Sequence, residues 1–331
     1  MSSAKAFTFL PLGAIIQTFK VNGVNIVQGF PTAELYKQFN SPYFGETIGR
    51  IANRVAEGKI NDLNGKSCQL PINNGPNSLH GGFNGWGKRV FEGPSTVERN
   101  GKEATLFKYV SVDGEEGYPG TVEVRVWYVQ DKEQVDGVQH EVLHIEYEAE
   151  LVGDEAKETA INMTNHSYFN LTGATTITGT EVNLITNKYQ VVDGGGIPTG
   201  PIEDYPGISP KTTFTLGEEK PDVDDCFVVN TDPSSIPIDT RSSPLQKIAS
   251  FYHPETNIHL EISSTEPGFQ FYTGKYIDVP TAGDVPARGA RSGFCVEPSR
   301  YVNAVNVPEY RSMVILKKGE KYGTKIVYRG W

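Results

Sequence analysis

Cysteine is scarce in this chain, and its placement excludes two structural classes. The three cysteines are Cys68, Cys226 and Cys295, scattered over 331 residues. An odd and dispersed set does not build a disulfide framework, and it lacks the closely spaced ligand pairs of a zinc ribbon. We therefore expect three free, buried thiols in a reducing compartment, which favours a cytoplasmic location.

Positive charge and long apolar runs are also in short supply. The 40 Asp and Glu residues outnumber the 30 Lys and Arg residues, which gives a formal net charge of −10. Phosphate-backbone binding needs an excess of basic residues, so we expect no nucleic-acid partner. The apolar stretch 7–16 is broken by Pro11 and Gly13 and is too short to cross a bilayer. We expect a soluble chain without a membrane partner, present as a monomer or weak homodimer.

Several motifs that accompany cofactor chemistry are missing from the sequence. It contains no G-x-G-x-x-G and no G-x-x-x-x-G-K-[ST], so dinucleotide and P-loop nucleotide binding have no support. It also contains no H-E-x-x-H and no G-x-S-x-G. We expect neither a cofactor nor a metal, and the remaining chemistry is acid–base catalysis by histidine and carboxylate side chains.

Glycine and alternating apolar residues are plentiful. The chain has 35 Gly and 21 Pro, which suits frequent reversals of direction. Val122, Val124, Val126 and Tyr128 share one face of a predicted strand, and the same alternation recurs over 143–151. These patterns predict an all-β protein, a large antiparallel β-sandwich.

Few other elements interrupt this pattern. The best helical candidate is the short segment 34–38. The glycine-rich stretch 194–210 is the loosest part of the chain, and we interpret it as a long surface loop rather than a domain boundary. We expect a single domain over residues 1–331.

Two histidines stand in unusual surroundings. His80 is followed by two glycines, which let the backbone approach a ligand or adopt positive φ, although an ordinary exposed turn would look the same. His166 lies in the polar segment 162–170. If this segment is one strand, a single face carries a row of hydrogen-bonding side chains that fits the floor of a hydrophilic cleft. The row consists of Asn162, Thr164, His166, Tyr168 and Asn170.

Other polar groups have the chemistry of a sugar site. Asn53 and Arg54 form a pair rich in hydrogen-bond donors, suited to hydroxyls or carboxylates. Asp224 and Asp225 precede an aromatic residue, and Gln270 lies between two phenylalanines, pointing away from both. Each of these features also occurs on ordinary protein surfaces.

Glu297 is a candidate base. It ends an apolar run and precedes a proline, which stops regular strand pairing. Desolvation there would raise the pKa of its carboxyl, whereas a nearby cation would lower it. A carboxylate at a strand end, opposite a histidine, is a plausible base–acid pair.

Five segments in order resemble the aldose 1-epimerases, or mutarotases. They are Asn53-Arg-Val-Ala-x-Gly58, Leu79-His-Gly-Gly82, Asn165-His-Ser-Tyr-Phe-Asn-Leu171, Asp224-x-x-Phe227 and Val296-Glu297-Pro. The stretches 297–306 and 322–328 look especially similar to the mutarotase domain of fungal bifunctional galactose epimerases. The other half of those proteins needs a Rossmann domain, which this sequence lacks. The resemblance therefore implies only the mutarotase reaction, on the galactose mutarotase-like sandwich.

The resemblance also implies a role for each matched position. Glu297 matches the general base and His166 the general acid. The implied substrate-binding residues are Arg54, His80 and Asp224, with Asn53 and Gln270 as further contacts. Asp225 and Cys226 stand where the family often has His or Asn, so either aspartate is a candidate for the sugar contact.

The reaction interconverts the α and β anomers of free hexoses such as galactose and glucose. It needs a proton removed from the C1 hydroxyl and one delivered to the ring oxygen. The usual pKa values of Glu and His, about 4.3 and 6.5, predict a carboxylate at Glu297 and an imidazolium at His166 near neutrality.

Three alternatives stay open. A glycoside hydrolase or lyase would use two carboxylates, for which Asp224 and Glu297 are candidates. A non-catalytic sugar-binding module would not need both Glu297 and His166. A hexose-6-phosphate epimerase would need further basic residues for the phosphate, and only Arg54 is found among the matched positions.

Overall fold

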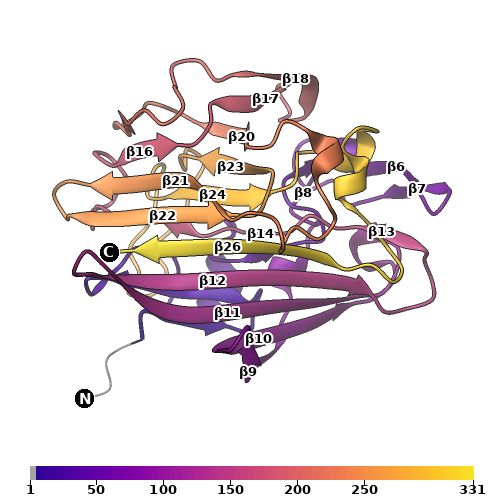
Figure 1. Cartoon of the computed structure of the whole chain (residues 1–331), viewed down its shortest axis with the longest axis horizontal. Helices are drawn as coiled ribbons and strands as arrows, with labels where there is room; N and C mark the ends of the chain where they lie inside the picture. The colour runs from indigo at the N-terminus through magenta and orange to yellow at the C-terminus, as the bar shows by residue number, and fades with distance from the viewer. Residues whose placement is uncertain (1–4) are drawn as a thin grey trace.

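Two antiparallel sheets dominate the structure. A computed structural model describes residues 5–331. The larger sheet has nine strands in the order β19-β16-β21-β22-β26-β12-β11-β10-β9, and Figure 1 shows most of them one above another, with β26 in yellow between β22 and β12. In chain order, the strands are β9 (Glu92–Arg99), β10 (Lys102–Ser111), β11 (Val122–Val135), β12 (Val138–Leu151), β16 (Glu181–Leu184), β19 (Phe214–Thr215), β21 (Gln246–His253), β22 (Ile258–Ser264) and β26 (Tyr322–Gly330).

The second sheet has six strands in the order β15-β24-β23-β20-β17-β18. In chain order, these strands are β15 (Tyr168–Phe169), β17 (Lys188–Val192), β18 (Pro198–Asp204), β20 (Asp224–Val228), β23 (Gly268–Tyr272) and β24 (Phe294–Ser299). Every pairing within it is antiparallel. The two sheets together confirm the predicted antiparallel sandwich.

Short elements complete the described part of the chain. A three-stranded sheet contains β1 (Phe7–Leu10), β2 (Ile15–Val21) and β3 (Val24–Asn25). Four two-stranded pairs join β4 (Thr47–Ile48) to β14 (Thr164–Asn165), β5 (Arg54–Val55) to β8 (Ser78–Leu79), β6 (Lys59–Leu63) to β7 (Lys66–Gln69), and β13 (Glu158–Ala160) to β25 (Ile315–Lys317). The single-turn 3-10 helices are η1 (Ala56–Gly58), η2 (Trp86–Lys88), η3 (Glu115–Gly117), η4 (Pro233–Ser235), η5 (Ala304–Asn306) and η6 (Arg311–Met313).

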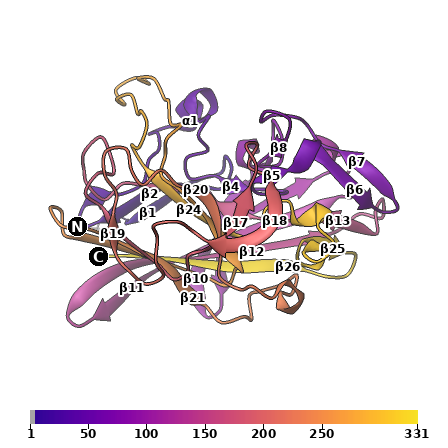
Figure 2. The same ribbon diagram turned by 90° about the horizontal axis from the view of Figure 1, so that it is seen from above.

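The predicted short helix is present as α1 (Ala33–Phe39). The Thr32 side chain accepts a hydrogen bond from the backbone N–H of Leu35 and so caps its first turn. In Figure 2, α1 lies on the opposite side of the molecule from strands β12 and β26. No helix within residues 5–331 is long and apolar enough to cross a membrane.

The largest hydrophobic core is built by strand alternation. The predicted face of β11, from Val122 to Tyr128, and the apolar face of β12 both belong to it and are fully buried. From the six-stranded sheet, Phe269, Phe271 and Phe294 enter the same core. Because successive side chains point to opposite faces, the residues between these phenylalanines face the other way. That other face carries the candidate site.

Two expectations about local structure are wrong. Residues 162–170 do not form one strand: β14 pairs with β4 and β15 pairs with β24, and His166 lies between them. Likewise, residues 194–210 are not simply a loop, since β18 pairs with β17 and the glycines form the turn between these strands. Pairing with strands distant in the sequence overrides the local polar composition of residues 162–170, whereas β18 pairs with its neighbour β17 in a hairpin.

Candidate active site

Three neighbouring strands supply one wall of the site. Gln270 on β23 lies directly opposite Glu297 on β24, and Asp224 begins β20 on the other side of β23. These side chains alternate with core residues, as the sequence predicted for Gln270 and Glu297. Glu297 and Gln270 are buried, whereas Asp224 is exposed to the opening. The sheet therefore gathers polar groups that lie 73 positions apart in the chain (297 − 224).

A second wall comes from the β5–β8 pair. Arg54 pairs with Leu79, and the backbone N–H of His80 donates to the carbonyl oxygen of Asn53. In return, the backbone N–H of Asn53 donates to Nδ1 of His80 over 3.2 Å. Gly81 follows with φ of +85°, and a side chain there would strike the carbonyl oxygen of Gly49. The glycine thus permits the tight turn that holds His80 against Asn53.

His166 is fixed between strands β14 and β15. Its backbone N–H donates to the carbonyl oxygen of Glu46, and its own carbonyl oxygen accepts from the N–H of Gly45. The imidazole is buried and packs edge-on against His80, with ring centroids 5.0 Å apart. Of the predicted polar row, only His166 and Tyr168 line the cavity. Asn162 instead bonds the backbone of Arg300, so the row is not a cleft floor as a whole.

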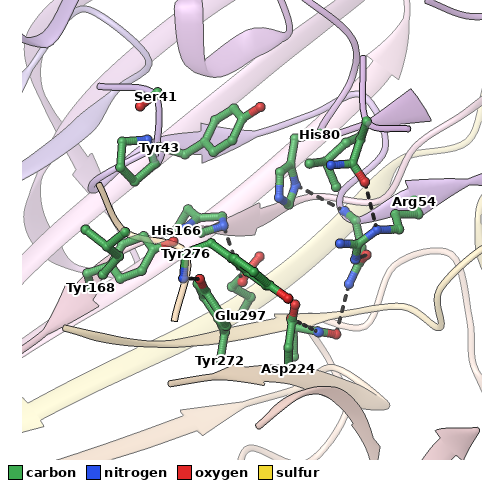
Figure 3. A pocket seen from close by; sticks show the side chains of 16 residues that line it. Ser41, Tyr43, Arg54, His80, His166, Tyr168, Asp224, Tyr272, Tyr276 and Glu297 are labelled. Atoms are coloured by element: carbon green, nitrogen blue, oxygen red, sulfur yellow. Dashed lines mark hydrogen bonds and ion pairs between the residues drawn. The ribbon is translucent and has the colours of Figure 1, made fainter. Parts of the chain in front are cut away.

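These walls enclose a cavity of about 400 Å³. All seven residues predicted for the site line it, and Figure 3 shows most of them around one space. They are Asn53, Arg54, His80, His166, Asp224, Gln270 and Glu297. The volume and polar lining suit a small hydrophilic ligand such as a single sugar ring.

A continuous chain of hydrogen bonds links the two walls. Arg54 Nη1 donates to Asn53 Oδ1 over 2.9 Å, and Asn53 Nδ2 donates to Gln270 Oε1 over 2.9 Å. Gln270 Nε2 then donates to Asp224 Oδ1 over 2.8 Å. The dashed lines in Figure 3 follow this chain. Each amide is held at both ends, so the donors and acceptors that face the cavity have fixed orientations before any ligand binds.

His166 and Glu297 form a close pair at the base of the cavity. Nε2 of His166 lies 3.4 Å from Oε1 of Glu297, and both side chains are about 5% exposed. Burial lowers the pKa of His166 to about 3. Burial, reinforced by Asp224, raises the pKa of Glu297 well above its usual value, although Arg54 opposes the shift. Burial thus favours the neutral form of both side chains, against the carboxylate and imidazolium expected from their ordinary pKa values.

The hydrogen bonding of His80 indicates which of its ring nitrogens carries the proton. Because its Nδ1 accepts from a backbone N–H, the proton of the neutral ring resides on Nε2. Burial lowers the pKa of His80 well below its usual value, and His166, Arg54 and Lys88 lower it further. The side chain is thus a neutral hydrogen-bond donor and not an acid.

The structure separates the two adjacent aspartates. Asp224 lines the cavity and accepts from Gln270. Asp225 is half-buried and points to the opposite face of β20, away from the cavity lining. Of the two candidates, only Asp224 is positioned to contact a ligand in this cavity.

Sequence reasoning missed most of the aromatic lining, since of its four tyrosines only Tyr168 belongs to the predicted polar row. Tyr43 packs against His80 and His166 with ring centroids 4.9 and 5.6 Å away. Tyr272 also lines the cavity, as does Tyr276, which is 75% exposed at its mouth. Tyr43 and Tyr276 lie in short connections outside the matched segments. In the sequence, the one indication of these two tyrosines is that each aromatic residue stands close to turn-forming residues.

The same histidines and carboxylate could be considered for a metal. Ligand atoms of His80, His166 and Glu297 lie within 4.8 Å of one another. The Nε2 of His80 carries a proton, however, and has no lone pair to offer. The set therefore fits hydrogen bonds to hydroxyl groups better than coordination of a metal.

A second cluster, Asp131, Glu133 and His144, lies on the large sheet. Its acids are already paired, Asp131 with Lys102 and Glu133 with Arg329. These ion pairs would have to break before the carboxylates could ligate a cation.

The antiparallel sandwich thus holds a buried histidine–glutamate pair in a polar cavity. The aldose 1-epimerase family model matches residues 3–329. Galactose mutarotase of Sus scrofa is 38% identical over 303 residues, which cover 90% of this chain and 81% of that protein. The chain belongs to the aldose 1-epimerase family, and the resemblance noted in its sequence is confirmed.

Other relatives are longer than this chain. Bifunctional protein GAL10 of Pachysolen tannophilus is 39% identical over 323 residues, covering 96% of this chain but 44% of that protein. The chain therefore spans less than half the length of these fungal relatives. Among solved structures, a GalM/aldose epimerase homologue from C. elegans has a TM-score of 0.81 at 24% identity and covers 98% of this chain and 95% of its own. This similarity supports the fold.

Proposed function

We propose that this chain is an isomerase, an aldose 1-epimerase that interconverts the α and β anomers of free hexoses such as galactose and glucose. The observation that carries the proposal is the His166–Glu297 pair, 3.4 Å apart in a polar cavity large enough for one sugar ring. The reaction needs two groups that exchange protons within reach of the same substrate, and no cofactor.

Ring opening and closing can be written with these two groups. The Glu297 carboxylate takes the proton of the C1 hydroxyl, and the His166 imidazolium delivers its Nε2 proton to the ring oxygen. The bond between C1 and the ring oxygen breaks while the aldehyde C=O forms. After rotation about C1–C2, the reverse transfers close the ring on the other face of C1. Protons and electrons are conserved over the cycle.

The neutral forms of His166 and Glu297 that burial favours are compatible with this scheme. A protonated Glu297 beside a neutral His166 contains the same number of protons as a carboxylate beside an imidazolium. Transfer of one proton from Oε1 to Nε2, over 3.4 Å, converts one form into the other. Arg54 favours the carboxylate form because it lowers the pKa of Glu297. Bound hydroxyl groups would add hydrogen bonds to the same carboxylate.

The remaining lining residues would hold the sugar. Arg54 and the Nε2–H of His80 are donors, and Asp224 is an acceptor; Asn53 and Gln270 keep these groups oriented. Such fixed contacts can retain the open chain while C1–C2 rotates. We propose substrate-binding roles for these five residues on this ground.

Polarimetry tests the proposal directly. Freshly dissolved α-glucose and α-galactose should approach their equilibrium rotation faster with the protein than in a buffer blank, in proportion to protein concentration. Rates equal to the blank for both sugars would refute the proposed activity.

The residues of the same site also bear on two alternative functions. A glycoside hydrolase would release nitrophenol from nitrophenyl glycosides, and such release would overturn the epimerase assignment. A hexose-6-phosphate epimerase would need cations for the phosphate. Arg54 is the sole Arg or Lys lining the cavity within residues 5–331, and Asp224 and Glu297 offset its charge. A free hexose is therefore the better substrate.

The wider context is also inferred. We propose that the chain works as a single domain, as a monomer or weak homodimer, with a small sugar as its partner and with neither nucleic acid nor a membrane. A cytoplasmic site of action fits the three cysteines, which are all buried and free.

A further inference from the structure

The imidazole of His166 has a partner at each nitrogen, and strand β24 supplies both. Nε2 faces Glu297, and Nδ1 lies 3.3 Å from the sulfur of Cys295. Residues 295 and 297 share one face of the strand, because strand side chains alternate. The ring therefore bridges two neighbouring positions on that face. Cys295 is fully buried and lies behind the cavity, outside its lining.

The proposed reaction places a demand on Nδ1. His166 must alternate between an imidazolium and a neutral ring that has given up its Nε2 proton. In both states the proton on Nδ1 stays in place, so the group facing Nδ1 has to accept a hydrogen bond throughout the cycle. A partner that instead donated to Nδ1 would force the neutral ring to carry its proton on Nε2 and would leave no basic nitrogen in the cleft.

We propose that Cys295 is a positioning residue, whose sulfur accepts the Nδ1–H of His166 and so keeps Nε2 as the nitrogen that exchanges protons with the sugar. This inference rests on the proposed function. Within residues 5–331, the sulfur is the hydrogen-bond partner of Nδ1. The thiol acts through His166 and does not touch the substrate.

A thiol sulfur facing Nδ1 suits a histidine that acts as an acid better than one that acts as a base. A carboxylate facing Nδ1 would stabilise the imidazolium and make it a poorer proton donor, which is the arrangement used where histidine must be a base. A thiol sulfur is a weak, uncharged acceptor. It can orient the ring while leaving the imidazolium ready to donate.

The thiol also remains uncharged under working conditions. Burial raises the pKa of Cys295 well above its usual value, and Glu297 raises it further. A thiolate at this position would have the same disadvantage as a carboxylate. The neutral thiol keeps the pair of His166 and Glu297 free of a third charge.

The tautomer of His166 can be measured without any substrate. Nitrogen-15 NMR of the histidine rings distinguishes a protonated from an unprotonated nitrogen. In the wild-type protein we expect the neutral His166 ring to be protonated at Nδ1. Cys295→Ala should weaken this preference, and Cys295→Ser should retain it because a hydroxyl oxygen also accepts. The matched control is Cys68→Ala, which removes another buried thiol from a separate hydrophobic cluster.

Kinetics give a second readout. We expect Cys295→Ala to lower kcat for anomerisation about tenfold, the scale of one hydrogen bond, with KM nearly unchanged. The alkaline limb of the kcat–pH profile should move to lower pH, because the imidazolium has lost an acceptor. Cys295→Ser should recover most of the rate, and Cys68→Ala should match wild type.

Two results would overturn the inference. One is a wild-type His166 ring protonated at Nε2. The other is a folded Cys295→Ala protein whose ring signals and kcat–pH profile match wild type. A wild-type chain that does not accelerate anomerisation would refute the proposed function, and the ring signals would still decide whether Cys295 fixes the tautomer.

Discussion

Replacing Glu297 with glutamine separates the chemical role of this residue from its structural one. Glu297→Gln keeps the shape of the side chain and removes the proton-exchanging carboxyl. General acid–base catalysis by one group contributes about 10²- to 10⁴-fold. At about 1.4 kcal/mol for each factor of ten, the barrier should rise by about 3 to 5.5 kcal/mol. Gln270, Asp224 and Arg54 stay in place, so KM should change much less than kcat.

The same substitution should lower the rate but raise the stability of the protein relative to wild type above about pH 4.3. The pKa of Glu297 is raised in the folded protein by burial and by Asp224. Such a group stabilises the native state fully below its unfolded pKa of about 4.3, and this contribution is lost as pH rises through the folded pKa. Within that window, the free energy of unfolding falls by up to about 1.4 kcal/mol per pH unit. Glutamine does not titrate, so Glu297→Gln should gain on wild type as pH rises above about 4.3.

Polarimetry and urea unfolding at several pH values measure the two effects. The matched control is Glu203→Gln on β18, where the side chain is exposed. It should leave the rate unchanged. A Glu297→Gln protein with a near-wild-type rate would refute its role as the base. An unfolding profile parallel to wild type would refute the raised pKa.

Three further changes test other parts of the site. His166→Asn should abolish most activity. Folding lowers the pKa of His166 from about 6.5 to about 3, so the wild type should lose stability as pH falls through this window. Urea unfolding at pH 4 and 7 should show a smaller loss of stability in the variant, because asparagine does not titrate. Asp224→Asn should raise KM about tenfold or more through a lost charged hydrogen bond, whereas steady-state rates of Asp225→Asn should stay near wild type. Gly81→Ala should cost at least 1–3 kcal/mol in unfolding free energy, since φ is +85° and the new methyl group meets Gly49.

The sequence pattern was a good guide where a local rule governs the structure. Alternation correctly assigned the faces of β11 and β12 and the outward direction of Gln270 and Glu297, because a strand has a period of two wherever it lies. It failed for residues 162–170, which are pulled into two different pairings. It also could not choose between Asp224 and Asp225, since the choice depends on which face of β20 meets the core.

The sequence by itself determined the sandwich, the family and the seven side chains that come together around the cavity. Only the tertiary structure decided their electrostatic state. Burial makes either ionic form costly, so the folded site lowers the pKa of His166 and raises that of Glu297, contrary to what their ordinary values suggest. The placement of Cys295 behind the imidazole was likewise decided by the fold, because the side chains of residues 129 positions apart meet only when β24 and the segment around His166 pack together.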